Sequence, residues 1–280
     1  MAIITGMIDV SSPWRLLITP PASGAWNMAV DEAIAQHAGR GAVPPTLRFY
    51  AWQPACVSVG RHQPLADIDP ARRAARGYGL VRRPTGGRAI LHTDELTYSI
   101  AGPQEHPILA GAVLDSYLRL SQGLLLGLAW LGLAVSKAPP TNRSGQDAGP
   151  VCFEVPSAYE IVVDGRKLVG SAQSRRQGWV LQHGTLPLAG DITRLVDTLA
   201  LADEAERAAQ RQVLAQRATT VQETLGRAVS FAEAAAALAA GFAEALSLHL
   251  EPGELTASEL AAAVELQRTV YASPEWTGKF

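Results

Sequence analysis

Cysteine is scarce in this sequence: 280 residues include two, Cys56 and Cys152. They form no CxxC pair and no Cys/His cluster, so the sequence offers no ligand set for a structural zinc ion, and we expect no metal. Two unrelated thiols also make no disulfide framework, which is typical of a reducing compartment. The sequence therefore favours a cytoplasmic protein.

The sequence also lacks a large excess of charge of one sign and long apolar runs. The net charge of −2 gives no reason to expect a partner among nucleic acids or anionic membranes. The longest apolar run, residues 123–135, is shorter than the ~20 residues that span a bilayer, so it predicts a buried helix. The opening residues show no basic stretch followed by an apolar one, and we expect no signal peptide.

What is present is a mixture of strand and helix patterns. Asp69-Pro70 is typical of a helix start, and capping-box pairs precede the helical patterns after Ser230 and Thr256. Strands are predicted at 14–19, 46–52, 56–60, 80–83, 89–91, 96–100 and 179–186, and helices at 27–36, 108–131 and from 192 onward. The predicted class is α+β, a mixed sheet flanked by helices. We expect a catalytic domain over residues 1–220 and a helical C-terminal segment packed on it over 221–280.

Asp164-Gly165 predicts a tight hairpin with Lys167 on its second strand. In this register Val162 pairs with Lys167, and one face carries Glu160, Val162, Lys167 and Val169. Apolar residues on both faces indicate a covered strand. Lys167 is then either an edge group that reaches water or a functional cation that lowers a thiol pKa and binds an acyl carbonyl.

Cys152 follows a stretch rich in proline and glycine and precedes that hairpin, a placement that suits a catalytic group on a loop. A thiol becomes a useful nucleophile where a nearby cation favours the thiolate. An isolated cysteine is more often inert packing, however, and Cys56 fits that interpretation because it lies within an apolar strand pattern.

A third feature is RRPTGGRAILH, residues 82–92, where two arginines end a strand and two glycines allow close approach of a ligand. A plain glycine turn between strands explains it equally well. His92 and His183 each adjoin a strand, and a lone strand histidine is more often structural than catalytic.

Together these stretches resemble the lipoate–protein ligase A / biotin–lipoyl ligase family. RRPTGGRAILH is similar to the family's arginine–diglycine signature, and DGRKLVGSAQSRRQGWVLQHGTL to its lysine strand and following hairpin. The segments CFEVPSAYE and LQRTVYASPEW resemble the branch of octanoyl-[acyl-carrier-protein]:protein N-octanoyltransferases of Gram-positive type. Arg88 stands where the signature often has a third glycine, which favours a transferase over an ATP-using ligase.

The resemblance implies a role for each matching residue. Cys152 would be the nucleophile that carries the acyl thioester, and Lys167 would activate it and bind the acyl carbonyl. His183 and Gly184 would belong to the substrate-binding set but lie behind the residues that line the pocket. The acyl pocket itself would be lined by Arg82, Gly86, Gly87, His92, Gly170, Ser171 and Ala172.

The resemblance thus implies an acyltransferase that needs no cofactor. It would move octanoyl from octanoyl-acyl carrier protein through Cys152 to a lysine of a lipoyl domain such as the glycine-cleavage H protein, in lipoate biosynthesis, and act as a monomer. One alternative is an ATP-dependent lipoate–protein ligase, which leaves Cys152 without a role. Others are an octanoyl amidotransferase from H protein to dehydrogenase E2 subunits and a non-catalytic accessory protein.

Overall fold

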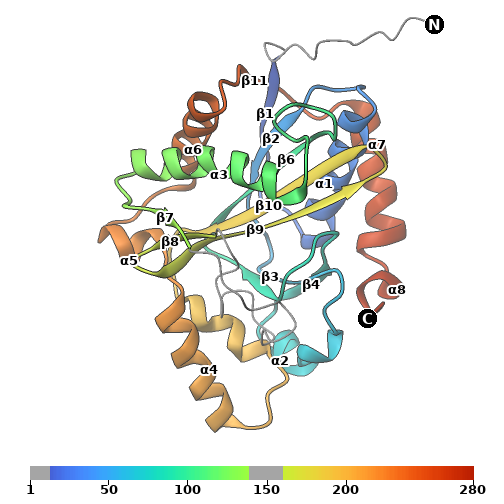
Figure 1. The fold of residues 1–280 in the computed structure, drawn as a ribbon. Coiled ribbons are helices and arrows are strands. Elements are labelled where there is room, and N and C mark those ends of the chain that lie inside the picture. Colours follow the sequence, from blue (N-terminus) through green and yellow to red (C-terminus); the bar gives the residue numbers. More distant parts are fainter. Residues whose placement is uncertain (1–12, 139–159) are drawn as a thin grey trace, which may run out of the picture.

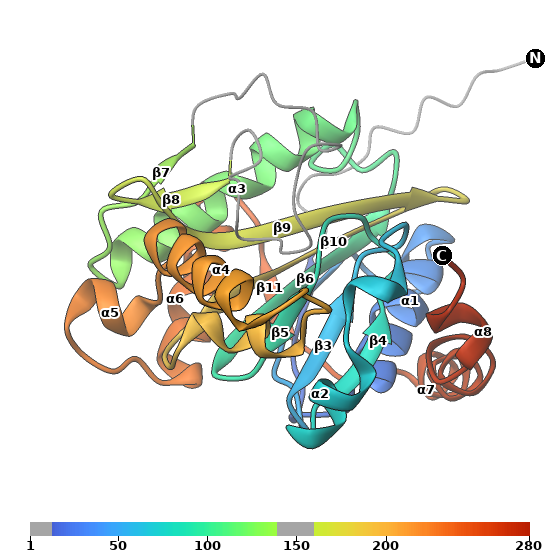
Figure 2. The ribbon, with the colours of Figure 1, turned by 90° about the horizontal axis from the view of Figure 1, so that it is seen from below.

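The computed structural model describes residues 13–138 and 160–280 of the chain. Its centre is an eight-stranded mixed sheet in the order β11-β1-β2-β6-β10-β9-β8-β7, beside a three-stranded sheet in the order β4-β3-β5 (Figures 1 and 2). The strands are β1 (Trp14–Ile18), β2 (Thr46–Tyr50), β3 (Cys56–Val59), β4 (Gly79–Arg82), β5 (Ile90–His92), β6 (Glu95–Pro103), β7 (Ser136–Lys137), β8 (Ile161–Val163), β9 (Arg166–Arg176), β10 (Trp179–Pro187) and β11 (Leu250–Pro252).

Helices flank the large sheet and dominate the last third of the chain, so the predicted α+β class with a helical C-terminal part is confirmed. The α-helices are α1 (Gly24–Gly39), α2 (Pro70–Ala75), α3 (Val113–Trp130), α4 (Glu204–Arg217), α5 (Val221–Leu225), α6 (Phe231–Ala245), α7 (Ala257–Leu266) and α8 (Pro274–Thr277). The described residues also contain the short 3₁₀ segments η1 (Leu65–Asp67) and η3 (Ile192–Thr198) and a π-helical turn, η4 (Gln267–Tyr271).

Alternation along the strands builds a separate core on each face of the large sheet. On β2, Leu47 and Phe49 join the core beneath α3 and α6, whereas Tyr50 joins the core beneath α1 and α7 (Figure 1). Successive side chains of a strand point to opposite faces, so each central strand supplies both cores. A third cluster lies between the small sheet, η3 and α4.

The helix starts predicted at Asp69-Pro70, Ser230 and Thr256 are found, because each has a polar side chain able to satisfy the first free backbone N–H groups. Asp69 caps α2 with Pro70 at its first position, and Thr256 and Glu259 form a complete capping box on α7. Ser230 caps α6, while the Glu233 carboxylate pairs with Arg227.

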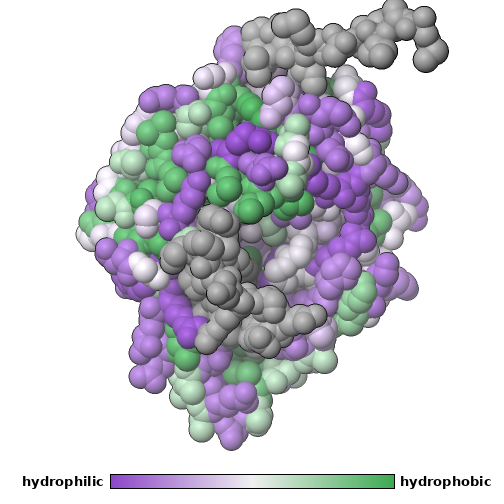
Figure 3. Space-filling model, in the orientation of Figure 1, coloured by the Kyte–Doolittle hydropathy of each residue, from purple (hydrophilic) through white to green (hydrophobic). Residues whose placement is uncertain are grey.

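The start predicted for the long helix at residue 108 is wrong by five residues. Gly111 has φ of +89°, a left-handed conformation that a helix cannot contain, and Ala112 caps α3 instead. Figure 3 shows apolar side chains on the face where α3 lies, and this helix exposes Val113, Leu114 and Trp130. Within the described residues no helix combines the length and apolar character needed to cross a membrane.

The Asp164-Gly165 hairpin is confirmed, with Val163 opposite Arg166 and Val162 opposite Lys167. One expectation about its faces is wrong. A bulge between these strands places Ile161, rather than Glu160, opposite Val169. Val169 therefore lies with Ile161 in the core under α3 and α6. A bulge adds one residue to one strand and reverses the alternation beyond it.

Helices α3 and α6 pack so closely that glycine is required at their crossing. A Cβ on Gly241 would overlap the backbone of Gly127 and come within 2.6 Å of the Gly123 carbonyl oxygen. We expect Gly241→Ala to lower the free energy of unfolding by about 2 kcal/mol, the range of overpacked cores, measured by urea denaturation. Ala236→Ser, on the exposed side of the same helix, serves as control, and an unchanged midpoint in Gly241→Ala would contradict this packing.

Candidate active site

A cavity of about 250 Å³ lies where the small sheet faces the large one beside α1. Part of its wall is formed by the apolar side chains of Met28, Tyr50 and Trp52, each at most 6% exposed. Gly86 and Gly87 form part of its exposed rim. A mostly apolar hollow with a few polar groups at fixed positions is typical of a small-ligand site.

The fold brings together eight of the nine residues predicted for the substrate site. The cavity is lined by Gly86, Gly87, His92, Gly170, Ser171, Ala172, His183 and Gly184. His183 and Gly184 were expected behind the lining residues but form part of the wall itself, because β10 pairs with β9 and both strands face the cavity.

Arg82 is the exception, and its neighbour Arg83 lines the cavity in its place. Adjacent residues of a strand point to opposite faces, so only one of the two arginines can face the pocket. The Arg82 guanidinium instead donates to the carbonyl oxygens of Thr277, Gly60 and Gln63 at 2.7–3.0 Å. Arg82 was expected to line the acyl pocket but does not line this cavity; it anchors the C-terminal residues against β4.

Arg83 holds the loop that contains Gly86 and Gly87, called here the diglycine loop, from inside the pocket. Its N–H groups donate to the carbonyl oxygens of Gly86, Arg88 and Ser58 and to the Ser58 hydroxyl, five bonds of 2.7–3.1 Å. These bonds tie the guanidinium to the backbone on both sides of the loop. Arg83 is thus a scaffold for the loop.

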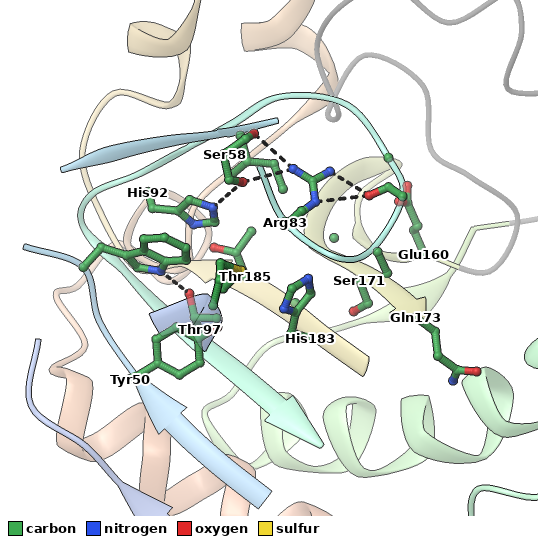
Figure 4. Close-up of a pocket in the computed structure, with 18 residues that line it drawn as sticks. Tyr50, Ser58, Arg83, His92, Thr97, Glu160, Ser171, Gln173, His183 and Thr185 are labelled. Atoms are coloured by element: carbon green, nitrogen blue, oxygen red, sulfur yellow. Dashed lines mark hydrogen bonds between the residues drawn. The ribbon is translucent and has the colours of Figure 1, made fainter. Parts of the chain in front are cut away.

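A hydrogen-bonded chain continues from Arg83 across the pocket wall (Figure 4). The Ser58 hydroxyl lies 2.8 Å from His92 Nε2, and His92 Nδ1 lies 2.7 Å from the Glu95 carboxylate. The His92 ring stacks on Trp52 with a centroid distance of 3.8 Å. Both ring nitrogens of His92 are engaged, which fixes the imidazole as part of the wall.

His183 connects the loop to a second buried cluster. Its Nε2 lies 2.6 Å from the Thr85 hydroxyl, and its Nδ1 lies 3.3 Å from the carboxylate of Asp31 on α1. Burial lowers the pKa of His183 against the opposing effect of Asp31, so the ring is neutral, with Nδ1–H donating and Nε2 accepting. Burial alone would raise the pKa of Asp31, but Arg48 and His183 outweigh it and lower that pKa.

Lys167 is completely buried, which excludes the interpretation of an edge lysine that reaches water. Its ammonium nitrogen lies 2.5 Å from Oε1 of Glu160, a residue 3% exposed that lines the cavity. The backbone N–H of Thr219 donates to the carbonyl oxygen of Lys167. This bond covers the edge of β9 beyond its last pair with β10, Gly170 with Thr185. Cys152, the predicted nucleophile, lies outside the described residues.

Several pocket residues were missed from the sequence. Arg83 stood beside the chosen arginine, and Glu160 had been placed on the face of Lys167 without a role. Tyr50, Trp52, Ser58 and Thr97 gave no local signal, because they come from β2, β3, β6 and the segment after β2, which the fold brings next to β9 and β10. Across residues 13–138 and 160–280, no group of three or more His, Cys, Asp and Glu side chains is arranged to hold a metal ion.

Residues 23–243 match the family model of the lipoyl protein ligase A/B catalytic domain. The chain belongs to this family. It is 47% identical over 278 residues to a protein named octanoyltransferase LipM from Symbiobacterium thermophilum, with 94% of this chain and 97% of that protein covered. The LipM of Bacillus subtilis is 39% identical, with 95% and 98% covered. These near-complete matches make the chain an enzyme of the transferase class.

Solved structures of the lipoyl ligase family share the fold. The bipartite lipoate–protein ligase of Thermoplasma acidophilum superposes with a TM-score of 0.80 at 25% identity, covering 96% of this chain and 97% of that one. The mixed sheet flanked by helices is therefore the family's catalytic fold.

Cys56 is predicted to be chemically inert in this family member. It is 2% exposed, and burial raises the pKa of its thiol to about 12. Because the thiolate is the reactive form, we expect no alkylation of Cys56 by iodoacetamide in the folded protein and full alkylation in urea. Peptide mass mapping measures both, and rapid labelling of folded Cys56 would contradict the packing.

Gly184 is predicted to be essential for pocket shape. A Cβ there would lie 2.5 Å from Ser171 Oγ and 2.6 Å from the Gly170 carbonyl oxygen, so β9 and β10 would have to move apart. We expect Gly184→Ala to reduce acyl transfer on the order of tenfold to a hundredfold, since small displacements of reacting groups are costly. Gly178→Asn, in the open turn of the same hairpin at φ +82°, should keep wild-type activity, and equal loss in both variants would refute a local effect.

Proposed function

We propose that the chain is an octanoyltransferase of lipoate biosynthesis. It takes an octanoyl group from octanoyl-acyl carrier protein, holds it as a thioester on Cys152, and passes it to a lysine of a lipoyl domain such as the glycine-cleavage H protein. The observation that carries this proposal is similarity over 94% of the chain to proteins named octanoyltransferase. We place the reaction in the cytoplasm and propose that the enzyme acts as a monomer.

The cavity suits an acyl chain better than a nucleotide. Met28, Tyr50 and Trp52 give part of the cavity wall an apolar surface against which the tail of the chain would lie. The cations of the RRPTGG loop are occupied, because Arg82 and Arg83 donate to backbone carbonyl oxygens. This occupation supports a transferase over an ATP-dependent ligase, which must hold triphosphate oxygens.

In the proposed mechanism the Cys152 thiolate attacks the donor thioester and the carrier's thiol leaves. The acceptor lysine amine then attacks the acyl-enzyme to give the amide. Two similar acyl transfers replace one encounter between two proteins, which is the usual advantage of covalent catalysis. Lys167 would stabilise the thiolate and the carbonyl oxygen, and inside the protein its ammonium group is paired with Glu160.

The test is intact-mass analysis of the purified protein after incubation with octanoyl-acyl carrier protein and no ATP. We expect an adduct of one octanoyl group, retained in Cys56→Ala and lost in Cys152→Ala. Adding a lipoyl domain should discharge the adduct and acylate the acceptor.

Two results would overturn parts of this proposal. ATP-dependent lipoylation by Cys152→Ala, without any adduct in the wild type, would establish the ligase instead. Loading from octanoyl-H protein but not from the carrier protein would indicate the amidotransferase.

A further inference from the structure

Arg82 is the arginine of the RRPTGG segment that faces away from the acyl pocket, and the proposed mechanism gives it no role. It is fully buried, and its guanidinium joins two segments that lie far apart in the sequence. Nε and Nη2 donate to the carbonyl oxygen of Thr277 at 3.0 and 2.8 Å. Nη1 donates to carbonyl oxygens of the turn that follows β3, those of Gly60 and Gln63 at 2.7 Å and that of Arg61 at 3.2 Å. Arg82 therefore ties this turn to α8.

The same turn is the outer support of the diglycine loop. The backbone N–H of Arg61 donates to the carbonyl oxygen of Thr85 at 2.8 Å. Gly60 lies so close to the loop that a Cβ there would come within 1.9 Å of the carbonyl oxygen of Gly87. Gly86 and Gly87 form part of the exposed rim of the cavity. A shift of the turn therefore moves the rim, because closely packed segments transmit displacement to one another.

The residues of α8 and those after it contact both Arg82 and the far end of the turn. Helix α8 packs against β4 (Figure 1), and Trp276 Nε1 donates to the carbonyl oxygen of Arg82 at 2.8 Å. The backbone N–H of Leu65 donates to the carbonyl oxygen of Phe280 at 3.0 Å. The Phe280 ring also meets the His62 ring at a centroid distance of 4.9 Å. Bonds and ring contacts thus hold the turn against this end of the chain.

Two adjacent arginines hold the pocket rim from opposite sides. Arg83 donates directly to carbonyl oxygens of the diglycine loop, whereas Arg82 reaches the loop through the turn. Lys167, the proposed catalytic lysine, lies on β9 of the large sheet, while the loop and the turn adjoin strands of the small sheet. A shift of the rim should therefore alter the fit of an acyl chain more than the chemistry at Lys167.

We propose that Arg82 is a positioning residue that couples residues 276–280 to the diglycine loop and thereby sets how tightly the pocket holds an acyl chain. The identity of the ligand rests on the proposed function, whereas the coupling between the two segments does not. Arg82 does not line the cavity and acts through the turn. Loss of either end of this connection should loosen the loop and weaken binding, with the rate at saturation retained.

The test compares Arg82→Met with a protein that lacks residues 276–280. The ligand is an unreactive ketone in which a CH₂ group replaces the thioester sulfur of octanoyl-N-acetylcysteamine, and calorimetry measures its affinity. For both variants we expect the affinity to fall on the order of tenfold, the usual size of such coupling. Amide hydrogen exchange of the peptide that spans residues 80–90 should become about tenfold faster. The kcat with saturating octanoyl-acyl carrier protein should stay within about twofold of the wild type.

Three further variants make the test specific. Arg82→Met in the shortened protein should lose little more affinity than the worse single variant, because both changes remove the same connection. Trp276→Phe keeps an aromatic ring but removes the bond to the Arg82 carbonyl oxygen, so its effect should be intermediate. The control is Arg207→Met, because Arg207 is also buried and donates to backbone carbonyl oxygens, those of Val196 and Leu199. It should lower stability in urea and leave ketone affinity unchanged.

Each other outcome has a distinct meaning. Wild-type affinity and exchange in the shortened protein would overturn the inference, and this protein and Trp276→Phe still decide if Arg82→Met does not fold. A fall in kcat at unchanged affinity, or an equal loss of affinity in Arg207→Met, would overturn it as well. If the wild type neither binds the ketone nor transfers octanoyl, the proposed function fails, and the exchange of residues 80–90 still decides whether the coupling exists.

Discussion

Asp31 reaches from α1 onto the face of the large sheet, where its carboxylate accepts hydrogen bonds from Arg48, Tyr50 and Ser99 at 2.7–2.8 Å. A fourth contact comes from His183 on β10. These donors belong to three different strands, so one buried carboxylate fixes the helix against the centre of the sheet. Removal of any donor would leave a buried charge with fewer partners, which is costly in the interior. The geometry of the pocket depends on this junction.

The junction extends to the diglycine loop through His183 and Thr85. The other side of the loop is held by Arg83, whose donors bind the loop's own carbonyl oxygens. A loop that contains two successive glycines has high conformational freedom, and ordering it costs entropy. Bonds from two independent clusters offset that cost and keep the cavity open between the sheets. The arginine–diglycine signature is thus explained by loop architecture as much as by ligand contact.

Much of the fold follows from local rules. Asp164-Gly165 specified its turn and the pairing of Val162 with Lys167, and Asp69-Pro70 specified a helix start, because these signals act over a few residues. The bulge that moved Val169 and the choice between Arg82 and Arg83 were not predictable in this way. Both depend on what packs against the strand: the core under α3 in one case, and the C-terminal residues against β4 in the other.

In the site, too, some residues follow from local patterns and others do not. The strand pattern left Lys167 as either an edge residue that reaches water or a functional cation inside the protein. Its burial depends on the residues after α4 that cover the strand, which the local pattern does not show. The hairpin register did place Glu160 and Lys167 on one face, so an ion pair was within reach of sequence reasoning. The contribution of Tyr50 and Trp52 to the pocket wall was not predictable from the sequence. The stacking of Trp52 on His92 depends on how the two sheets are placed relative to each other.

The ion pair of Lys167 and Glu160 is the second buried charge cluster beside the pocket, with 2.5 Å between the ammonium nitrogen and Oε1 of the carboxylate. The two residues are 0% and 3% exposed, so neither charge is solvated by bulk water. The pair is neutral as a unit, which limits the cost of burying two charges next to an apolar cavity. Replacement of either member would leave the other buried without its opposite charge, so the position of each residue depends on the other.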